Sequence, residues 1–277
     1  MSVLCEVDTQ RHPSTRVAAI TGANGTLGFA FTRGLAAAGY AVYMLVRRVE
    51  ETRTLAEPLR DAGLRVEVVG CDVLDRDAME RALEAVVEDA GRVDVLVNCA
   101  GGNQAGATVM PEAAVFDLSV EALRQVTDLN LLGTMIPSLV FAEAMSQQGS
   151  GCIVNVSSMA ASQPLTRVVG YSAAKAAVDN FTKWLAVELA QKYGEGLRVN
   201  AIAPGFFLAD QNRRLLTEED GSLTARGQTI VSQTPMGRFG EPEELLSTLL
   251  WLCDPASSFV TGIVVPVDGG FSAFSGV

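Results

Sequence analysis

Short apolar runs that are rich in β-branched residues recur along this chain, and longer segments of helical periodicity separate them. The runs are continuous and not alternately polar, which is typical of strands covered on both faces. We expect seven strands, at residues 16–20, 41–46, 64–70, 93–98, 152–157, 197–203 and 263–268. We expect helices at residues 27–39, 76–91, 119–149, 171–194 and 241–254. Pro137 favours a kink in the third helix. This alternation predicts an α/β fold: a single doubly wound Rossmann-type domain whose seven-stranded parallel sheet carries helices on both faces.

The composition bounds the domain organisation. The chain has 277 residues, of which 48% are hydrophobic, and this is enough for one large core. We expect a polar N-terminal tail at residues 1–15 and a single domain at residues 16–277, in which the irregular segment 205–240 forms a substrate lid. The tail has no apolar core of signal-peptide length, and no apolar run approaches about 18 residues. We therefore expect neither secretion nor a membrane span.

Charge and cysteine content narrow the class of protein. The net charge of −11 disfavours nucleic-acid binding, because phosphate contacts need Lys and Arg. The same charge repels an anionic substrate at long range, so local arginines must overcome it if the substrate is an acid. The five cysteines form no CxxC pair and no zinc-type spacing, and we interpret them as buried free thiols in a reducing cytoplasm.

A glycine-rich turn, "AAITGANGTLG", follows the first expected strand and begins the first expected helix. Glycines allow a tight turn and a close approach of a pyrophosphate, and a helix N-terminus offers N–H groups to it. The position of the turn in a strand–helix–strand unit therefore indicates a dinucleotide-binding site.

This turn resembles the T-G-x-x-x-G-x-G motif of the short-chain dehydrogenase/reductase family, with one departure. Thr21, Gly22 and Gly28 match, but Thr26 stands where the middle glycine is usual. We expect Gly25 to supply the conformational freedom that this glycine would give.

Further motifs extend the resemblance from about residue 16 to residue 270. They are "CDV" at 71–73, "NCAG" at 98–101, Asn130 in "DLNLLGT", the S-x12-Y-x3-K spacing of Ser158, Tyr171 and Lys175, N-x3-P-G at 200–205 and "VDGG" at 267–270. The resemblance implies a nicotinamide-dependent oxidoreductase with catalytic residues Asn130, Ser158, Tyr171 and Lys175. It implies a cofactor site made of Gly22, Asn24, Thr26, Leu27, Gly28, Arg47, Arg48, Asp72, Val73, Asn98, Ala100, Gly101, Tyr171, Lys175, Pro204 and Gly205.

The end of the second strand bears on the choice of cofactor. A carboxylate that binds the adenosine ribose is expected there, but Val46 takes its place and Arg47 and Arg48 follow. Guanidinium groups suit a 2′-phosphate, so NADP(H) is favoured. Glu50 or Glu51 could reach back to the ribose, so NAD(H) stays open.

The proton chemistry needs no histidine. Tyr171 and Lys175 are four residues apart at a helix start and lie on one face. The ammonium group and an oxidised nicotinamide both favour tyrosinate, so Tyr171 can act as a general acid or base. Ser158 can bond the substrate oxygen, and its spacing to Tyr171 favours it over Ser157. The resemblance implies that Asn130 holds a water that links Lys175 to solvent.

The sequence constrains the identity of the substrate less than that of the cofactor. Candidate substrate-binding residues are Asn103, Ser158, Gln163, Arg167, Gln211 and Arg213. Many family members carry a threonine where this chain has Ala209. Several segments resemble the D-mannonate oxidoreductase (fructuronate reductase) subgroup, which implies interconversion of D-fructuronate and D-mannonate. Another polyol, sugar or secondary alcohol stays open, as does a non-catalytic nucleotide-binding regulator. The family resemblance also implies a homotetramer or homodimer.

Overall fold

The computed structural model describes residues 15–209 and 213–276 of the chain. Seven strands form one sheet in which every neighbouring pair is parallel, in the order β3-β2-β1-β4-β5-β6-β7. Their bounds are β1 Val17–Thr21, β2 Ala41–Val46, β3 Val66–Gly70, β4 Val95–Asn98, β5 Gly151–Val156, β6 Leu197–Pro204 and β7 Val264–Val267. The expected doubly wound, seven-stranded parallel fold is confirmed, and each strand begins and ends within two residues of its expected range or inside it.

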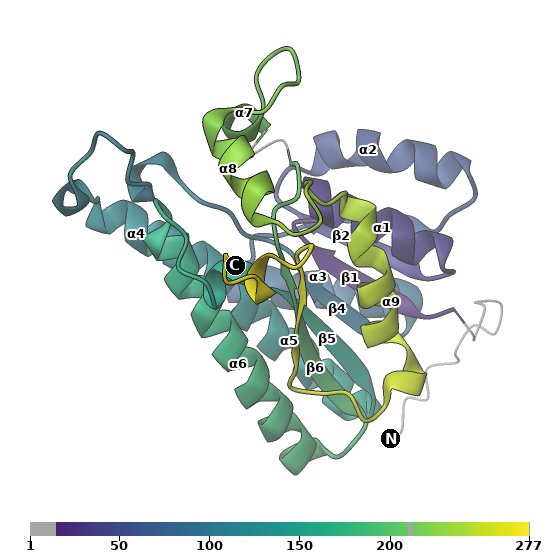
Figure 1. The fold of residues 1–277 in the computed structure, drawn as a ribbon. Coiled ribbons are helices and arrows are strands. Elements are labelled where there is room, and N and C mark those ends of the chain that lie inside the picture. Colours follow the sequence, from purple (N-terminus) through teal and green to yellow (C-terminus); the bar gives the residue numbers. More distant parts are fainter. Residues whose placement is uncertain (1–14, 210–212, 277) are drawn as a thin grey trace, which may run out of the picture.

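Helices cover both faces of the sheet (Figure 1). Their bounds are α1 Thr26–Ala37, α2 Val49–Asp61, α3 Arg76–Ala90, α4 Val120–Thr127, α5 Gly133–Gln148, α6 Val169–Tyr193, α7 Arg213–Leu216, α8 Ala225–Gln233 and α9 Leu246–Cys253. The core on one face contains buried residues of α3, α5 and α6, and the core on the other contains residues of α1, α2 and α9. These two apolar layers explain why the strand sequences are continuously hydrophobic.

Helix α2 lies outside the helices expected from the sequence. It carries Pro58 and a mostly exposed surface, with only Thr52 and Ala56 buried. Such a helix shows a narrow apolar stripe, and its formation depends on packing against the sheet next to β3.

The segment expected as one helix at 119–149 is divided, and the expected kink at Pro137 is not where the division lies. A π-helical turn at Asp128–Leu132 separates α4 from α5. In this turn the Asn130 side chain donates a hydrogen bond to the Val126 carbonyl oxygen at 2.8 Å, an acceptor that a regular α-helix would give to a backbone N–H. The side chain of Asn130 thus replaces part of the helical ladder.

The same stretch, Val120–Gln148, is long and apolar enough by length and composition to cross a membrane. Half of its most apolar window is buried inside the molecule. Helix α5 supplies Val140, Phe141 and Met145 to the core under the sheet. Its apolar character is therefore explained by the fold.

The carboxyl ends of the parallel strands meet at one edge, and the segment expected as a lid rises above that edge (Figure 1). In it, α7 and α8 enclose a small core of their own made by Leu216, Ile230 and Phe239. The neighbouring strands β1 and β4 send the chain to opposite faces of the sheet, which is where doubly wound folds bind ligands.

Candidate active site

A cavity of about 760 Å³ lies at this edge, between the strand ends and the segment that contains α7 and α8. One wall is the glycine-rich turn, where Gly22, Asn24, Thr26, Leu27 and Gly28 all line the cavity. Gly25 precedes α1 and offers no side chain to cap the N–H groups of its first turn. A helix N-terminus of this kind fits the pyrophosphate of a dinucleotide.

Two glycines of the turn are required by the backbone. Gly22 has φ +63°, and a Cβ there would lie 2.7 Å from the Ala100 Cα. A Cβ on Gly28 would lie 2.3 Å from the Gly22 carbonyl oxygen. Gly25, by contrast, has φ −79°, which any residue can adopt. The expectation that Gly25 supplies special conformational freedom is therefore wrong, and Thr26 simply begins the helix.

The end of β2 is arranged as the sequence suggested. Val46 is buried, while Arg47 and Arg48 are exposed, and all three line the cavity. Arg48 pairs with Glu51 at 3.0 Å, and both side chains are more than 60% exposed. An exposed pair of this kind adds little stability, so it leaves Arg48 able to exchange partners.

Two of the proposed cofactor residues lie beside the cavity wall. Asp72 accepts a hydrogen bond from the Leu74 N–H at 3.0 Å, and the cavity is lined by its neighbours Cys71 and Val73. Asn98 is buried and donates to Ser138 and Asn155. Asp72 thus fixes the backbone that follows it, whereas Asn98 joins the end of β4 to β5 and α5. Ala100, Gly101, Pro204 and Gly205 line the cavity itself.

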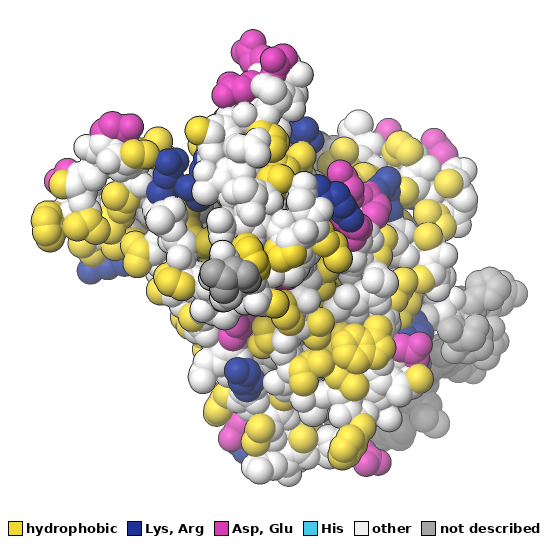
Figure 2. All heavy atoms as spheres, viewed as in Figure 1, with side chains coloured by type: hydrophobic (Ala, Val, Ile, Leu, Met, Phe, Trp, Pro, Cys, Tyr) yellow, Lys and Arg dark blue, Asp and Glu magenta, His cyan; other side chains and the backbone are white. Residues whose placement is uncertain are grey.

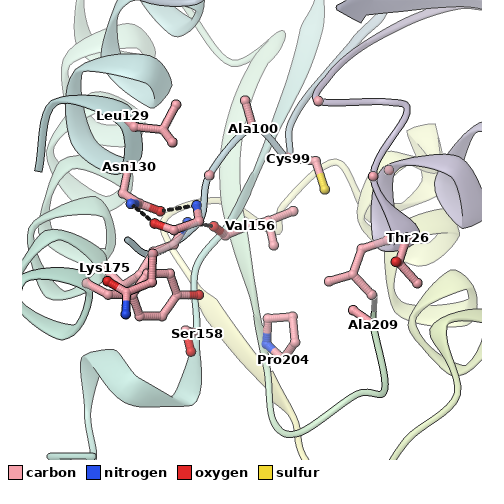
Figure 3. Close-up of a pocket in the computed structure, with 18 of the residues that line it drawn as sticks. Thr26, Cys99, Ala100, Leu129, Asn130, Val156, Ser158, Lys175, Pro204 and Ala209 are labelled. Atoms are coloured by element: carbon pink, nitrogen blue, oxygen red, sulfur yellow. Dashed lines mark hydrogen bonds between the residues drawn. The ribbon is translucent and has the colours of Figure 1, made fainter. Parts of the chain in front are cut away.

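The four proposed catalytic residues come together on the opposite wall. Figure 3 shows Asn130, Lys175 and Ser158 on one side of the cavity, facing Thr26 and Ala209. Tyr171 also lines the cavity, and its hydroxyl is close enough to that of Ser158 for the serine to influence its pKa. Ser158 follows β5 and Tyr171 lies in the first turn of α6, so the two ends of this connection bring both side chains to the same cavity.

Asn130 is fully buried and holds the loop after β4. Its amide nitrogen donates to the Gly102 carbonyl oxygen at 2.7 Å, and its amide oxygen accepts from the Gly102 N–H at 3.1 Å (Figure 3). A side chain on Gly101 would come within 2.7 Å of that oxygen. Asn130 therefore positions backbone that lines the cavity.

Lys175 is 3% exposed, and its ammonium group donates to the Val156 carbonyl oxygen at 2.7 Å. Burial lowers the pKa of Lys175 to about 8, although Cys99 and Asp179 oppose this shift. Burial raises the pKa of Tyr171, and the hydrogen bond to Ser158 opposes that shift. Burial of the phenol itself is the largest cause, so the pKa of Tyr171 in the protein alone does not show the lowering that was expected from Lys175.

The two adjacent serines have different partners. The Ser157 hydroxyl is buried and donates to the Asp179 carboxylate. The Ser158 hydroxyl accepts from the Ala160 N–H at 3.1 Å, and Ser158 lines the cavity together with Tyr171. This arrangement supports the sequence-based preference for Ser158.

The predicted substrate residues are only partly brought together. Asn103 lines the cavity and donates to Thr108. The Gln163 side chain donates to the Ser272 carbonyl oxygen, and Arg213 is exposed on α7. Arg167 lies between two residues that line the cavity, Leu165 and Val168. Gln211 lies outside the described residues.

One residue of the cavity wall escaped the sequence-based selection. Arg226, in the first turn of α8, lines the cavity together with Leu215 and Leu216 of α7. No spacing motif identifies it, since it reaches the cavity only through the packing of α8 on α7. Its signal in the sequence is a lone arginine in an otherwise neutral segment.

Within residues 15–209 and 213–276, no group of three His, Cys, Asp or Glu side chains could hold a metal ion. Cys71, Cys99, Cys152 and Cys253 are free thiols, and all but Cys99 are buried. The described wall of the cavity offers a phenol, an ammonium group, guanidinium groups, hydroxyls, thiols, amides and backbone N–H groups.

Comparison with known proteins agrees with this geometry. Residues 16–220 match the family model described as short chain dehydrogenase. An uncharacterized oxidoreductase, UxuB, of Bacillus subtilis is 46% identical over 271 residues, which cover 95% of this chain and 96% of that protein.

Two solved structures share the fold closely. A protein from Haemophilus influenza, provisionally named a D-mannonate oxidoreductase and solved with bound NAD, is 39% identical with a TM-score of 0.88, over 96% of this chain and 98% of that one. A single-substitution variant of actinorhodin polyketide ketoreductase, solved with NADPH, is 31% identical with a TM-score of 0.84, over 95% of this chain and 100% of that one. The chain belongs to the short-chain dehydrogenase family of oxidoreductases, which act on alcohol and carbonyl groups.

Proposed function

We propose that this protein interconverts D-fructuronate and D-mannonate by hydride transfer with a nicotinamide cofactor. The observation that carries the reaction is the meeting of Ser158, Tyr171 and Lys175 at one wall of the cavity, with the Lys175 ammonium group 5.6 Å from the Tyr171 ring centroid. The sugar-acid substrate is supported by the likeness to the Haemophilus protein named for D-mannonate.

The protein's own residues supply binding, orientation and proton transfer. When bound, the nicotinamide supplies or accepts the hydride at the substrate carbon. Ser158 holds the substrate oxygen, and the Tyr171 hydroxyl gives that oxygen a proton in reduction or its phenolate takes one in oxidation. Lys175 keeps positive charge beside the phenol, which favours the phenolate once the cofactor's charge is added.

The cofactor end of the cavity supports NADP(H) as the preferred cofactor, with NAD(H) as the alternative. Val46 offers no carboxylate to a ribose, and Arg47 is exposed at the cavity edge. Arg47→Ala should raise KM for NADP by about tenfold, as expected for one lost charge-assisted contact, and leave KM for NAD nearly unchanged. Equal effects on both cofactors would contradict the preference.

The substrate proposal is tested by turnover of a panel of aldonates, keto-uronates and simple secondary alcohols, with NAD and NADP in parallel. We expect D-mannonate and D-fructuronate to give the highest kcat/KM. Turnover of simple alcohols without any sugar acid would contradict the substrate and leave the reaction class intact.

We also propose a cytoplasmic homotetramer or homodimer. In support, α6 exposes Val169, Trp184 and Val187 by more than half of their surfaces. Figure 2 shows hydrophobic side chains gathered over α9, where Trp251 is also exposed. Large exposed apolar side chains on a helix favour association. Light scattering coupled to size exclusion measures the assembly, and a monomeric wild-type protein would contradict it.

A further inference from the structure

Arg226 is held firmly at the edge of the cavity. It lies two residues after Thr224, whose hydroxyl caps α8 by accepting a hydrogen bond from the Gly227 N–H at 3.0 Å. The same hydroxyl donates to the Leu215 carbonyl oxygen at 2.8 Å, and the Thr224 N–H donates to the Leu216 carbonyl oxygen at 3.1 Å. These bonds join the start of α8 to the end of α7, so the backbone of Arg226 is fixed relative to the cavity wall.

Arg167 lies just before α6, and its neighbours Leu165 and Val168 line the cavity. Among the described residues it is the one non-glycine with positive φ, at +79°. Its carbonyl oxygen accepts a hydrogen bond from the Val109 N–H at 2.9 Å, which ties the turn to the loop after β4. A left-handed conformation is unfavourable for arginine, and strain of this kind gathers at ligand sites.

The positive charge of Arg167 acts on the Arg226 guanidinium group. Burial, and then the positive charge of Arg167, lower the pKa of Arg226. Within the described part of the chain, neither arginine forms an ion pair with a carboxylate. Two neighbouring cations without an anion repel each other, and an anion between them would remove that repulsion.

The surroundings make this local positive charge unusual. The exposed residues Glu218, Glu219 and Asp220 lie between α7 and α8. Figure 2 shows acidic side chains, in magenta, at the tip of this segment. The whole chain carries a net charge of −11. An anionic ligand that reaches the cavity therefore needs a compensating cationic group close by.

We infer that Arg226 and Arg167 form a carboxylate-binding subsite that receives the acid group of the substrate at the lid end of the cavity. The subsite deepens the proposed function and rests on it for the sugar part of the substrate. Arginine suits this role because its planar fork binds a carboxylate through two parallel hydrogen bonds. The carboxylate would then anchor one end of the substrate while Ser158 and Tyr171 hold the reacting oxygen.

The direct test measures, by calorimetry, how tightly the cofactor-loaded protein binds each of two matched probes. D-Gluconate carries a carboxylate, and D-glucitol is its neutral counterpart. We expect wild type to bind gluconate at least about tenfold more tightly than glucitol. Arg226→Gln and Arg167→Gly should each remove this preference, and glycine keeps the backbone at position 167 free of strain. Arg226→Lys should restore part of it.

The matched control is Arg81→Gln, which removes one exposed arginine on α3, away from the cavity. It makes the net charge of the protein more negative by the same amount as Arg226→Gln does. We expect it to leave the preference for gluconate over glucitol unchanged. If Arg81→Gln weakens gluconate binding as strongly as Arg226→Gln, the effect is a general field effect and the subsite is wrong. Weaker cofactor binding by Arg226→Gln with unchanged gluconate binding would assign Arg226 to the cofactor phosphates and overturn the inference.

Kinetics separate this inference from the proposed function. If wild type turns over hexonates and Arg226→Gln keeps the wild-type KM for them, the subsite is wrong and the function stands. If gluconate binding depends on Arg226 but no hexonate is turned over, the subsite stands and the proposed substrate is wrong. We expect a rise of about tenfold to hundredfold in KM for sugar acids, with a smaller change in kcat.

Discussion

The ammonium group of Lys175 lies 5.6 Å from the ring centroid of Tyr171 and donates a 2.7 Å hydrogen bond to the Val156 carbonyl oxygen. The contact places a buried cation beside the proposed acid–base phenol. It also ties α6 to the end of β5, which delivers Ser158. The distance between these elements is therefore fixed by the same side chain that supplies the charge.

This burial has a consequence for stability. The pKa of Lys175 is lowered from 10.5 to about 8 in the folded protein, so the unfolded chain binds more protons between these values. Stability rises with pH wherever the unfolded state binds more protons. Relative to Lys175→Met, wild type should therefore gain stability as pH rises from about 8 toward 10.5. Urea unfolding of both proteins at several pH values measures this, and a constant difference would contradict the lowered pKa.

The glycine turn offers a matched pair of substitutions. In Gly28→Ala the new Cβ would meet the Gly22 carbonyl oxygen at 2.3 Å, so we expect a loss of about 1–3 kcal/mol in the free energy of unfolding. In Gly25→Ala the nearest atom is 3.4 Å away and φ is negative, so the loss should stay within about 1 kcal/mol. Chemical denaturation measures both values. Equal losses would show that Gly25 does have a special backbone role.

The adjacent serines should separate catalysis from stability. Ser158→Ala removes the hydroxyl that lies beside Tyr171 at the cavity wall, and we expect kcat to fall by about 10²-fold while the folded protein is little affected. Ser157→Ala leaves the Asp179 carboxylate without its buried donor, and we expect a loss of about 1–3 kcal/mol in the free energy of unfolding. Steady-state kinetics and urea unfolding on both variants make the comparison. The reverse pattern would transfer the catalytic role to Ser157.

The sheet could be predicted from the sequence because its strands are buried on both faces. Such strands must be continuously apolar, and β2 shows this from Ala41 to Val46. Helix α2 could not be predicted in the same way, since its buried surface is narrow and Pro58 interrupts its pattern. The division of the long helix depends on the contact of Asn130 with Gly102, which is distant in sequence.

The same contrast holds for the site. Tyr171, Lys175 and Ser158 follow a fixed spacing across a strand end and a helix start, so their meeting could be predicted. The special role given to Gly25 was wrong, because φ values depend on the local turn and not on residue type alone. Arg226 reaches the cavity through packing between α7 and α8, and no local pattern encodes that contact.

The central claim is that Tyr171 transfers the proton, and the most direct test is the rate of hydride transfer in Tyr171→Phe. The absorbance of the reduced nicotinamide measures this rate, with D-mannonate as the substrate. The substitution removes only the hydroxyl group, so the fold and the cofactor site should be kept. We expect kcat to fall by about 10²–10⁴-fold while cofactor affinity, measured by fluorescence titration, stays at the wild-type value. A kcat near that of wild type would contradict the assignment of Tyr171 as the proton-transfer group.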